Sequence, residues 1–241
     1  MRRVEFSFTW AIIIANGLVF LLAQLLGVMG SNALPLVLLG ANSPLLILDG
    51  EIWRFMSSGF LHTNLLHFAL NMYSLWLLGG FVERFYSKRK FLVVYLAGIL
   101  AGSLVSFLVA SISVFAGAGL AGNIFSLGAS GGIFALLGLV IGTSFFVRNA
   151  PDLPIDRNQL LLIAGLNLLF GFAFPGVDNA AHIGGLLMGL ALSLVAMPYS
   201  DAFSSNWQKG LLKFSSIALV CILGLSFLLQ ILSSALLVAG S

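Results

Sequence analysis

Runs of about 20 apolar residues recur along the whole chain, and they restrict its fold more than any other feature. Each run is long enough to cross a hydrocarbon core of roughly 30 Å as a helix. Strands of a membrane barrel would alternate in polarity, and these runs do not. Charged residues make up 8% of the 241 residues, whereas soluble domains carry about 25%. The sequence therefore predicts an all-α, polytopic membrane helical bundle.

Seven spans are predicted, at about 8–29, 63–83, 90–111, 130–148, 158–174, 179–198 and 211–238. The segment 30–61 is too apolar for a water-exposed loop and too rich in Pro and Gly to span, so we expect it in the membrane interface. The basic N-terminus and first run also fit a cleaved signal peptide, but the run is long and no clear small-x-small cleavage site follows, so an uncleaved span is preferred. We expect one domain over 1–241, with a core at about 8–198 and an extra span at about 211–238.

The basic residues indicate the orientation of the bundle. With the N-terminus inside, ten of the eleven Lys and Arg residues fall on the cytoplasmic side, and only Arg54 lies outside. This bias follows the positive-inside rule and places the C-terminus outside. The pI near 9.3 therefore reflects topology, and no nucleic-acid partner is expected.

Cys221 is the only cysteine, and it lies within an apolar run. We interpret it as a small buried hydrophobic residue. One Cys and three His residues provide no cluster of metal ligands, so neither a metal nor a cofactor is expected.

Polar residues inside a bilayer are costly, and here they gather at one depth. His67, Ser130 and His182 each lie 16 to 18 residues before the predicted cytoplasmic end of a different span. That separation is roughly 24–27 Å at the helical rise per residue. The three side chains are therefore expected at one level, toward the outer side of the membrane.

Small residues at four-residue spacing predict close helix packing near this level. Ala181, Gly185 and Gly189 form one such stripe, and Gly131 and Ala135 form another. Packing alone is the simpler interpretation of a small-residue stripe. Because one stripe begins directly before His182, it would also bring that residue toward the serine of the fourth span.

Ser130 and His182 are a candidate nucleophile and general base, since a serine hydroxyl reacts only when a base takes its proton. No carboxylate is expected to orient the imidazole. Asp178, one turn before His182, is predicted to cap the sixth span, because Asp is a favoured N-cap. Phe134, one turn after Ser130, is expected to stack on the imidazole. The pattern therefore predicts a Ser–His dyad.

A developing oxyanion needs hydrogen-bond donors. The candidates are the Asn71 amide, an N–H of His67 and the backbone N–H of Ser130 at a helix N-terminus. Gly128 and Gly131 would let the backbone approach a substrate carbonyl. Nucleophile, base and oxyanion donors together are the parts needed for acyl transfer.

Five segments resemble motifs of the rhomboid intramembrane serine proteases. "GASGGIFALLG" resembles the GxSG motif that opens the fourth core helix, and "AAHIGGLLMG" resembles the histidine and glycine stripe of the sixth. "HTNLLHFALN" has the His-x4-His-x3-Asn spacing of the second helix, and "GGFVER" resembles its end. "EIWRF" resembles the Trp–Arg motif of the first loop. The resemblance covers about 51–198 and the first span.

The resemblance implies a six-helix core with one added C-terminal helix, and a protease that cleaves transmembrane segments of other membrane proteins. It implies Ser130 as nucleophile, His182 as base, and His67 and Asn71 in the oxyanion hole. The expected partners are transmembrane protein substrates and the lipid bilayer. The expected location is the plasma membrane of a prokaryote, with the active site toward the outer face.

The resemblance also implies that the loop with Trp53 and Arg54 is structural; Arg54 is expected to bond loop carbonyls and Trp53 to anchor at the interface. His62 is a supporting candidate, expected at the interface rather than in the chemistry. Phe134 departs from the family pattern, where many relatives carry tyrosine.

Two alternative functions remain. One is that of an inactive relative that binds and escorts membrane helices. The other is a small transporter or channel, although the polar groups cluster near one face only.

Overall fold

A computed structural model describes residues 7–27, 34–115, 125–146, 156–174, 176–194 and 206–239. Seven of its helices have 15 residues or more: α1 (Phe8–Leu25), α5 (Leu65–Phe85), α6 (Lys88–Phe115), α7 (Ser130–Phe146), α8 (Arg157–Ala173), α9 (Asn179–Ser193) and α10 (Asn206–Ala239). Within the described ranges, the only β pairing is an isolated bridge between Asn42 and Ser126. The all-α prediction is confirmed, and each predicted span overlaps one of these helices. Residues 28–29, 147–148 and 195–198 of the predicted spans lie outside the described residues.

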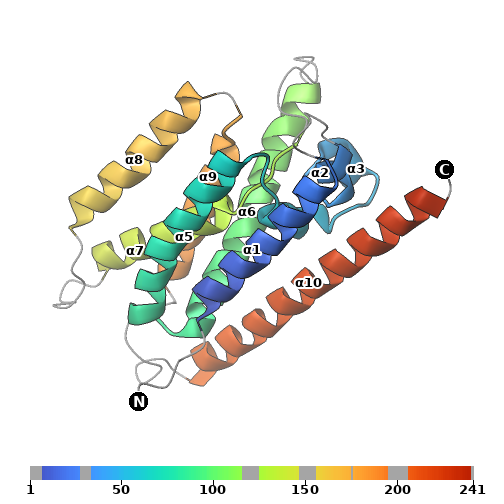
Figure 1. Cartoon of the computed structure of the whole chain (residues 1–241). Coiled ribbons are helices and arrows are strands. Elements are labelled where there is room, and N and C mark those ends of the chain that lie inside the picture. Colours follow the sequence, from blue (N-terminus) through green and yellow to red (C-terminus); the bar gives the residue numbers. More distant parts are fainter. Residues whose placement is uncertain are drawn as a thin grey trace.

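Four of the described helices are long and apolar enough to cross a membrane, namely α1, α5, α6 and α10. The helices α7, α8 and α9 are also apolar but shorter. Figure 1 shows α6 in the middle of the bundle, with α10 along one side and α8 on the opposite side. The chain is thus a multi-pass helical membrane protein.

The centre of the bundle is the close packing of α6, α7 and α9. A Cβ atom added at Gly189 would lie 1.9 Å from the carbonyl oxygen of Ala135, and one at Gly185 would lie 2.1 Å from that of Gly131. On the α6 side, a Cβ atom at Gly102 would lie 2.7 Å from the Ala181 oxygen. No larger side chain fits at these contacts. The close approach predicted from the small-residue stripes is confirmed.

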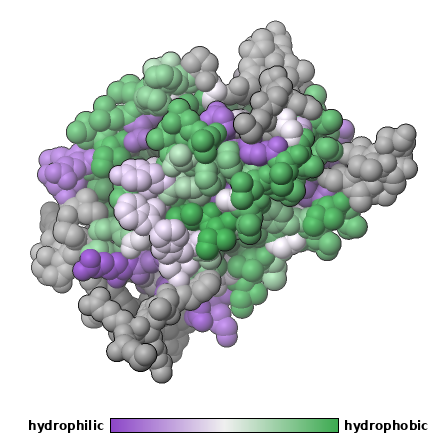
Figure 2. All heavy atoms as spheres, viewed as in Figure 1, coloured by the Kyte–Doolittle hydropathy of each residue, from purple (hydrophilic) through white to green (hydrophobic). Residues whose placement is uncertain are grey.

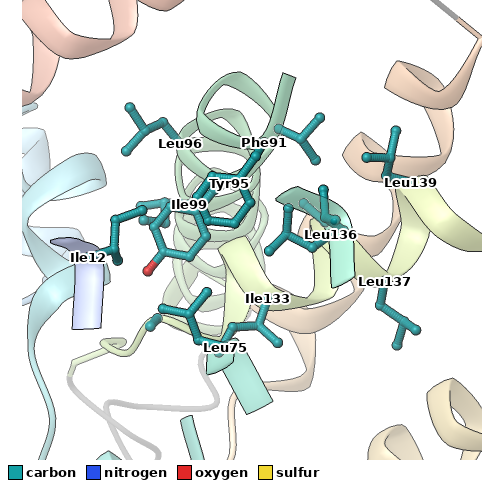
Figure 3. Packing of buried hydrophobic residues seen from close by; sticks show 14 of the residues in the cluster. Ile12, Leu75, Phe91, Tyr95, Leu96, Ile99, Ile133, Leu136, Leu137 and Leu139 are labelled. Atoms are coloured by element: carbon teal, nitrogen blue, oxygen red, sulfur yellow. The ribbon is translucent and has the colours of Figure 1, made fainter. Parts of the chain in front are cut away.

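The hydrophobic core lies between α1, α5, α6 and α7. Tyr95 and Leu96 of α6 and Leu136 and Leu139 of α7 are fully buried there, together with Leu75 of α5. Figure 3 shows these side chains spread along α6 and α7, with the Tyr95 ring near the middle. Many large hydrophobic residues are also exposed on the outside of the helices, and the face in Figure 2 shows wide hydrophobic areas with smaller hydrophilic patches between them. A surface of this kind is stable in a lipid environment rather than in water.

The start of α1 lies beside the end of α5. Glu83 accepts hydrogen bonds from Ser7 Oγ at 2.6 Å and from the Phe8 and Thr9 amides at 2.7 and 3.2 Å. The carboxylate thus satisfies amide groups that the first turn of a helix leaves unpaired. These bonds place the two helix ends on one side of the bundle, as the topology prediction requires.

The segment before α5 folds into short helices: α2 (Leu34–Leu38), α3 (Pro44–Leu48), α4 (Arg54–Ser57) and the 3-10 turn η2 (Ser58–Phe60). It packs against α6 and α10. Helices of three to five residues cannot span a bilayer, which agrees with the prediction for this part of the chain. The segment forms a folded loop along the bundle.

The prediction for Cys221 is wrong, because its side chain is exposed. α10 buries one stripe, which includes Ser216, Leu219, Ser226 and Gln230. Cys221 lies off this stripe, so it faces outward. The apolar run was identified correctly, but it does not show which face of a lipid-exposed helix meets protein.

Candidate active site

Ser130 is the first residue of α7 and is half-buried. The preceding turn contains Gly128, which has a φ of +128°. A Cβ atom at Gly128 would lie 2.9 Å from Nε2 of His67 and 3.8 Å from Oγ of Ser130. The hydroxyl and the imidazole therefore flank the same glycine. A left-handed backbone and this crowding both require glycine here.

The Gly128 turn is held from its other side by the loop before α5. The Gly128 amide donates to the Ser58 carbonyl at 3.0 Å. Because Ser58 lies in η2, the loop fixes the position of the turn from which α7 begins. The first amides of α7 lack partners within their own helix and favour negative charge nearby.

His182 lies in the first turn of α9 and is 8% exposed. Its ring stacks on that of Phe134, with a centroid distance of 4.2 Å and an interplanar angle of 12°. This is the contact predicted from the sequence. Because Phe134 is one turn after Ser130, the imidazole lies beside the first turn of α7. Its Nδ1 is buried and, among the described residues, has no hydrogen-bond partner.

Asp178 caps α9, as predicted. Its Oδ1 accepts from the Ala181 amide at 3.0 Å. The His182 amide donates to the Asp178 carbonyl at 3.1 Å. In the described part of the chain, however, the Asp178 carboxylate makes no hydrogen bond to the His182 imidazole, so the ring is held by stacking. Ser130 and His182 likewise share no hydrogen bond within these ranges, although such bonds are often long in resting enzymes and tighten with substrate.

The first turns of α5 supply His67 and Asn71. Asn64 caps the helix by accepting from the His67 amide at 2.9 Å. Thr63 Oγ1 lies 3.4 Å from Nδ1 of His67, which leaves Nε2 as the nitrogen that faces Gly128. The Asn71 amide donates to the His67 carbonyl at 2.9 Å, so one of its donors is already used inside α5.

His62 is completely buried, beside the rings of His67 at 5.0 Å and Phe68 at 5.4 Å. Neither ring nitrogen has a hydrogen-bond partner among the described residues. Burial, and next the neighbouring His67, lower the pKa of His62 from 6.5 to about 3. His62 is therefore neutral at physiological pH and acts as a packed ring beneath His67.

Trp53 and Arg54 do not join this cluster. Arg54 Nη1 donates to the Val37 and Ala41 carbonyls at 2.8 and 2.9 Å, which is the structural role predicted for it. Arg54 also forms a salt bridge with Glu51. Trp53 Nε1 donates to Oε1 of Gln230 in α10 at 2.9 Å. Trp53, expected as an interface anchor, thus ties the loop to the last long helix.

Sequence reasoning missed two polar residues near the site. Ser106 of α6 and Ser126, before the Gly128 turn, both donate to Oδ2 of Asp178. They are 72 and 52 residues from it in sequence, and nothing in the local pattern marks them. The described residues include no group of three or more His, Cys, Asp or Glu that could hold a metal ion.

A comparison with known protein families matches the part of the chain that contains these candidate residues. The family model of the Rhomboid domain matches residues 49–199. The chain is 35% identical over 208 residues to "Rhomboid protease GluP" of Bacillus subtilis, covering 86% of this chain and 38% of that protein. It is 32% identical over 178 residues to "Rhomboid protease AarA" of Providencia stuartii, covering 66% of this chain and 61% of that protein.

A plant relative, "RHOMBOID-like protein 5" of Arabidopsis thaliana, is 37% identical over 164 residues, covering 66% of this chain and 48% of that protein. The chain thus spans less than two thirds of the length of each of these relatives. The matched family region includes the Gly128 turn, the start of α7 and the start of α9.

Proposed function

The chain belongs to the rhomboid family, and on this premise we propose that it is an intramembrane serine protease with Ser130 as nucleophile and His182 as general base. The observation that carries the proposal is the meeting of three helices at one turn. Ser130 and His67 flank Gly128, and His182 stacks on Phe134 one turn further along α7.

The proposed reaction is acyl transfer. Ser130 Oγ attacks the carbonyl carbon of a peptide bond while His182 accepts the hydroxyl proton. The oxygen of the tetrahedral intermediate takes hydrogen bonds from the Ser130 amide, from Nε2–H of His67 and from the free donor of Asn71. His182 then gives its proton to the leaving amine, and an acyl enzyme forms. Water, deprotonated by His182, hydrolyses this ester and restores the serine.

The surroundings support this chemistry in a membrane. Ser130 is half-buried, so it is accessible, whereas the helices around it present an apolar outer surface. The substrate in this proposal is a transmembrane segment of another protein that unwinds at the site. The site faces the outer side of a prokaryotic plasma membrane, and the chain is one domain of seven spans with α10 added to a six-helix core.

Cleavage of a single-span protein in proteoliposomes tests the proposal, with the cut site determined by mass spectrometry. We expect Ser130→Ala and His182→Ala to abolish cleavage. We also expect a fluorophosphonate to label the wild type but not Ser130→Ala. Ser144→Ala is the matched control, because Ser144 lies at the other end of α7 and bonds the Ile141 carbonyl. A wild type that binds membrane helices but is neither labelled nor active would instead support an inactive rhomboid-like protein.

A further inference from the structure

Asp178 does more than cap a helix. Its Oδ1 accepts from the Ala181 amide at 3.0 Å, and its Oδ2 accepts from Ser106 Oγ at 2.5 Å and from Ser126 Oγ. The three donors belong to α9, to α6 and to the segment before α7. One carboxylate thus joins the three elements that surround the site.

Capping alone does not explain this choice of residue. An N-cap needs one side-chain oxygen, and Ser or Asn provides it as well as Asp does. The second oxygen of Asp178 is used by two hydroxyl groups. Hydrogen bonds to an ionised acceptor are roughly twice as strong as neutral ones, so the carboxylate is suited to hold the two serines.

Ser126 is also fixed from the opposite side. Its amide donates to the Asn42 carbonyl at 2.9 Å, and the Asn42 amide donates back to the Ser126 carbonyl at 3.0 Å. Two residues later, the Gly128 amide donates to the Ser58 carbonyl at 3.0 Å. The segment from Ser126 to Gly128 therefore runs between the loop before α5 and the carboxylate of Asp178.

The same helix supports both sides of this arrangement. On α6, Ser103 accepts from the Asn42 side-chain amide at 2.8 Å through its carbonyl, and its hydroxyl lies 3.2 Å from that of Ser58. One turn further along, Ser106 bonds Asp178. α6 therefore contacts the loop through Ser103 and binds Asp178, at the start of α9, through Ser106. The Gly128 turn is connected to α6 through the loop and through Ser126.

The spacing links this network to the proposed chemistry. Ser126 lies four residues before Ser130, and Asp178 lies four residues before His182. We propose that Asp178 is a positioning residue, whose carboxylate, through Ser106 and Ser126, sets the turn before Ser130 relative to the helix that carries His182. This inference rests on the proposed function.

The consequence is a specific kinetic signature. Loss of the network leaves the packing of α7 on α9 in place, because that contact is made by small residues that follow Ser130 on α7 and His182 on α9. It lets the turn before Ser130 shift relative to His182, and misplacement by about 1 Å can cost on the order of 100-fold in rate. We therefore expect kcat to fall while KM stays the same.

Four variants test the inference. Asp178→Ser keeps a good N-cap but is too short to reach both serines, and Ser126→Ala removes one donor while leaving the cap intact. Ser126→Thr retains the hydroxyl and is the conservative rescue. Asp156→Ser is the matched control, because Asp156 caps α8 by accepting from the Asn158 amide at 2.8 Å and lies outside the network.

For each variant, kcat and KM on a single-span substrate, the rate of fluorophosphonate labelling at Ser130 and the folded fraction are measured in the same liposomes. We expect Asp178→Ser and Ser126→Ala to lower kcat and the labelling rate about 10- to 100-fold, with KM unchanged, and Ser126→Thr and Asp156→Ser to resemble the wild type. Equal effects of Asp178→Ser and Asp156→Ser, or losses that disappear after correction for the folded fraction, would overturn the inference.

If Asp178→Ser does not fold, Ser126→Ala alone tests the inference. The inference is then overturned if Ser126→Ala has the kcat and the labelling rate of the wild type. Failure of the proposed function has a different result. In that case the wild type itself is not labelled at Ser130, and both proposals fall together.

Discussion

Gly128 carries the strongest single-residue constraint at the site, because two independent features exclude a side chain there. Its φ is +128°, and a Cβ atom would lie 2.9 Å from Nε2 of His67. We expect Gly128→Ala to cost about 1–3 kcal/mol of stability. We also expect it to reduce the proposed proteolysis by about tenfold or more, since it displaces His67 from the proposed oxyanion site. Cleavage and denaturant unfolding in micelles measure the two effects. Gly80→Ala is the control, because nothing lies within 4 Å of its added Cβ; equal behaviour of both variants would contradict the prediction.

His62 makes stability depend on pH. Burial and next His67 lower its pKa from 6.5 to about 3, so between these values the unfolded chain binds a proton that the folded chain does not. The contribution of neutral His62 is therefore fully present above pH 6.5 and is lost as the pH falls toward 3. At pH 5 the loss is about 2 kcal/mol, from about 1.4 kcal/mol per pH unit below 6.5.

His62→Leu removes this titration. On going from pH 7.5 to pH 5, we expect the wild type to lose about 2 kcal/mol of unfolding free energy more than the variant does. Denaturant unfolding in micelles at the two pH values measures it. A difference that is the same at both pH values would show that His62 is not held neutral by its surroundings.

At the scale of elements, the contact between α7 and α9 determines whether the two proposed catalytic groups can meet. A Cβ atom at Gly189 would lie 1.9 Å from the Ala135 carbonyl oxygen, two turns beyond His182 on the same helix. Gly189→Ala must therefore separate the helices, and we expect a cost of about 1–3 kcal/mol together with a loss of activity.

Thermal unfolding in detergent and cleavage of a single-span substrate check the effect of Gly189→Ala. The control is Gly165→Ala in α8, where nothing lies within 4 Å of an added Cβ. If Gly189→Ala were as stable and active as Gly165→Ala, tight packing of α7 on α9 would not be required for the site.

The elements themselves could be predicted from the sequence, because long apolar runs and small-residue stripes are local signals. α7 begins at Ser130 and α9 at Asn179, as the predicted spans do. The stacking of Phe134 on His182 followed from the same spacing. The two serine partners of Asp178 and the glutamine partner of Trp53 could not be predicted, because they lie 52 to 177 residues away and depend on how the helices pack. The outward face of Cys221 was missed for the same reason.

At the scale of the whole molecule, the side chain of Gln230 joins α10 to the loop before α5 by hydrogen bonds. Gln230 is 4% exposed; it accepts from Trp53 Nε1 at 2.9 Å and donates to the Leu38 carbonyl. We expect Gln230→Ala to destabilise the protein by about 1–3 kcal/mol, because it leaves polar groups of the loop without these partners. Hydrogen exchange should increase in residues 34–57.

Cys221→Ala is the control for this substitution, because it also shortens a side chain of α10 but at an exposed position. We expect it to leave both the stability and the exchange of the loop unchanged. Equal exchange in the two variants would mean that the Gln230 side chain does not hold the loop.

The bond between Trp53 and Gln230 also has a consequence for biosynthesis. The two residues are 177 positions apart, so at about 5–20 residues per second a ribosome adds the second roughly 9–35 s after the first. During that interval the early loop exists without its late partner. The nascent protein therefore waits for its last long helix before a region near its beginning reaches its final form.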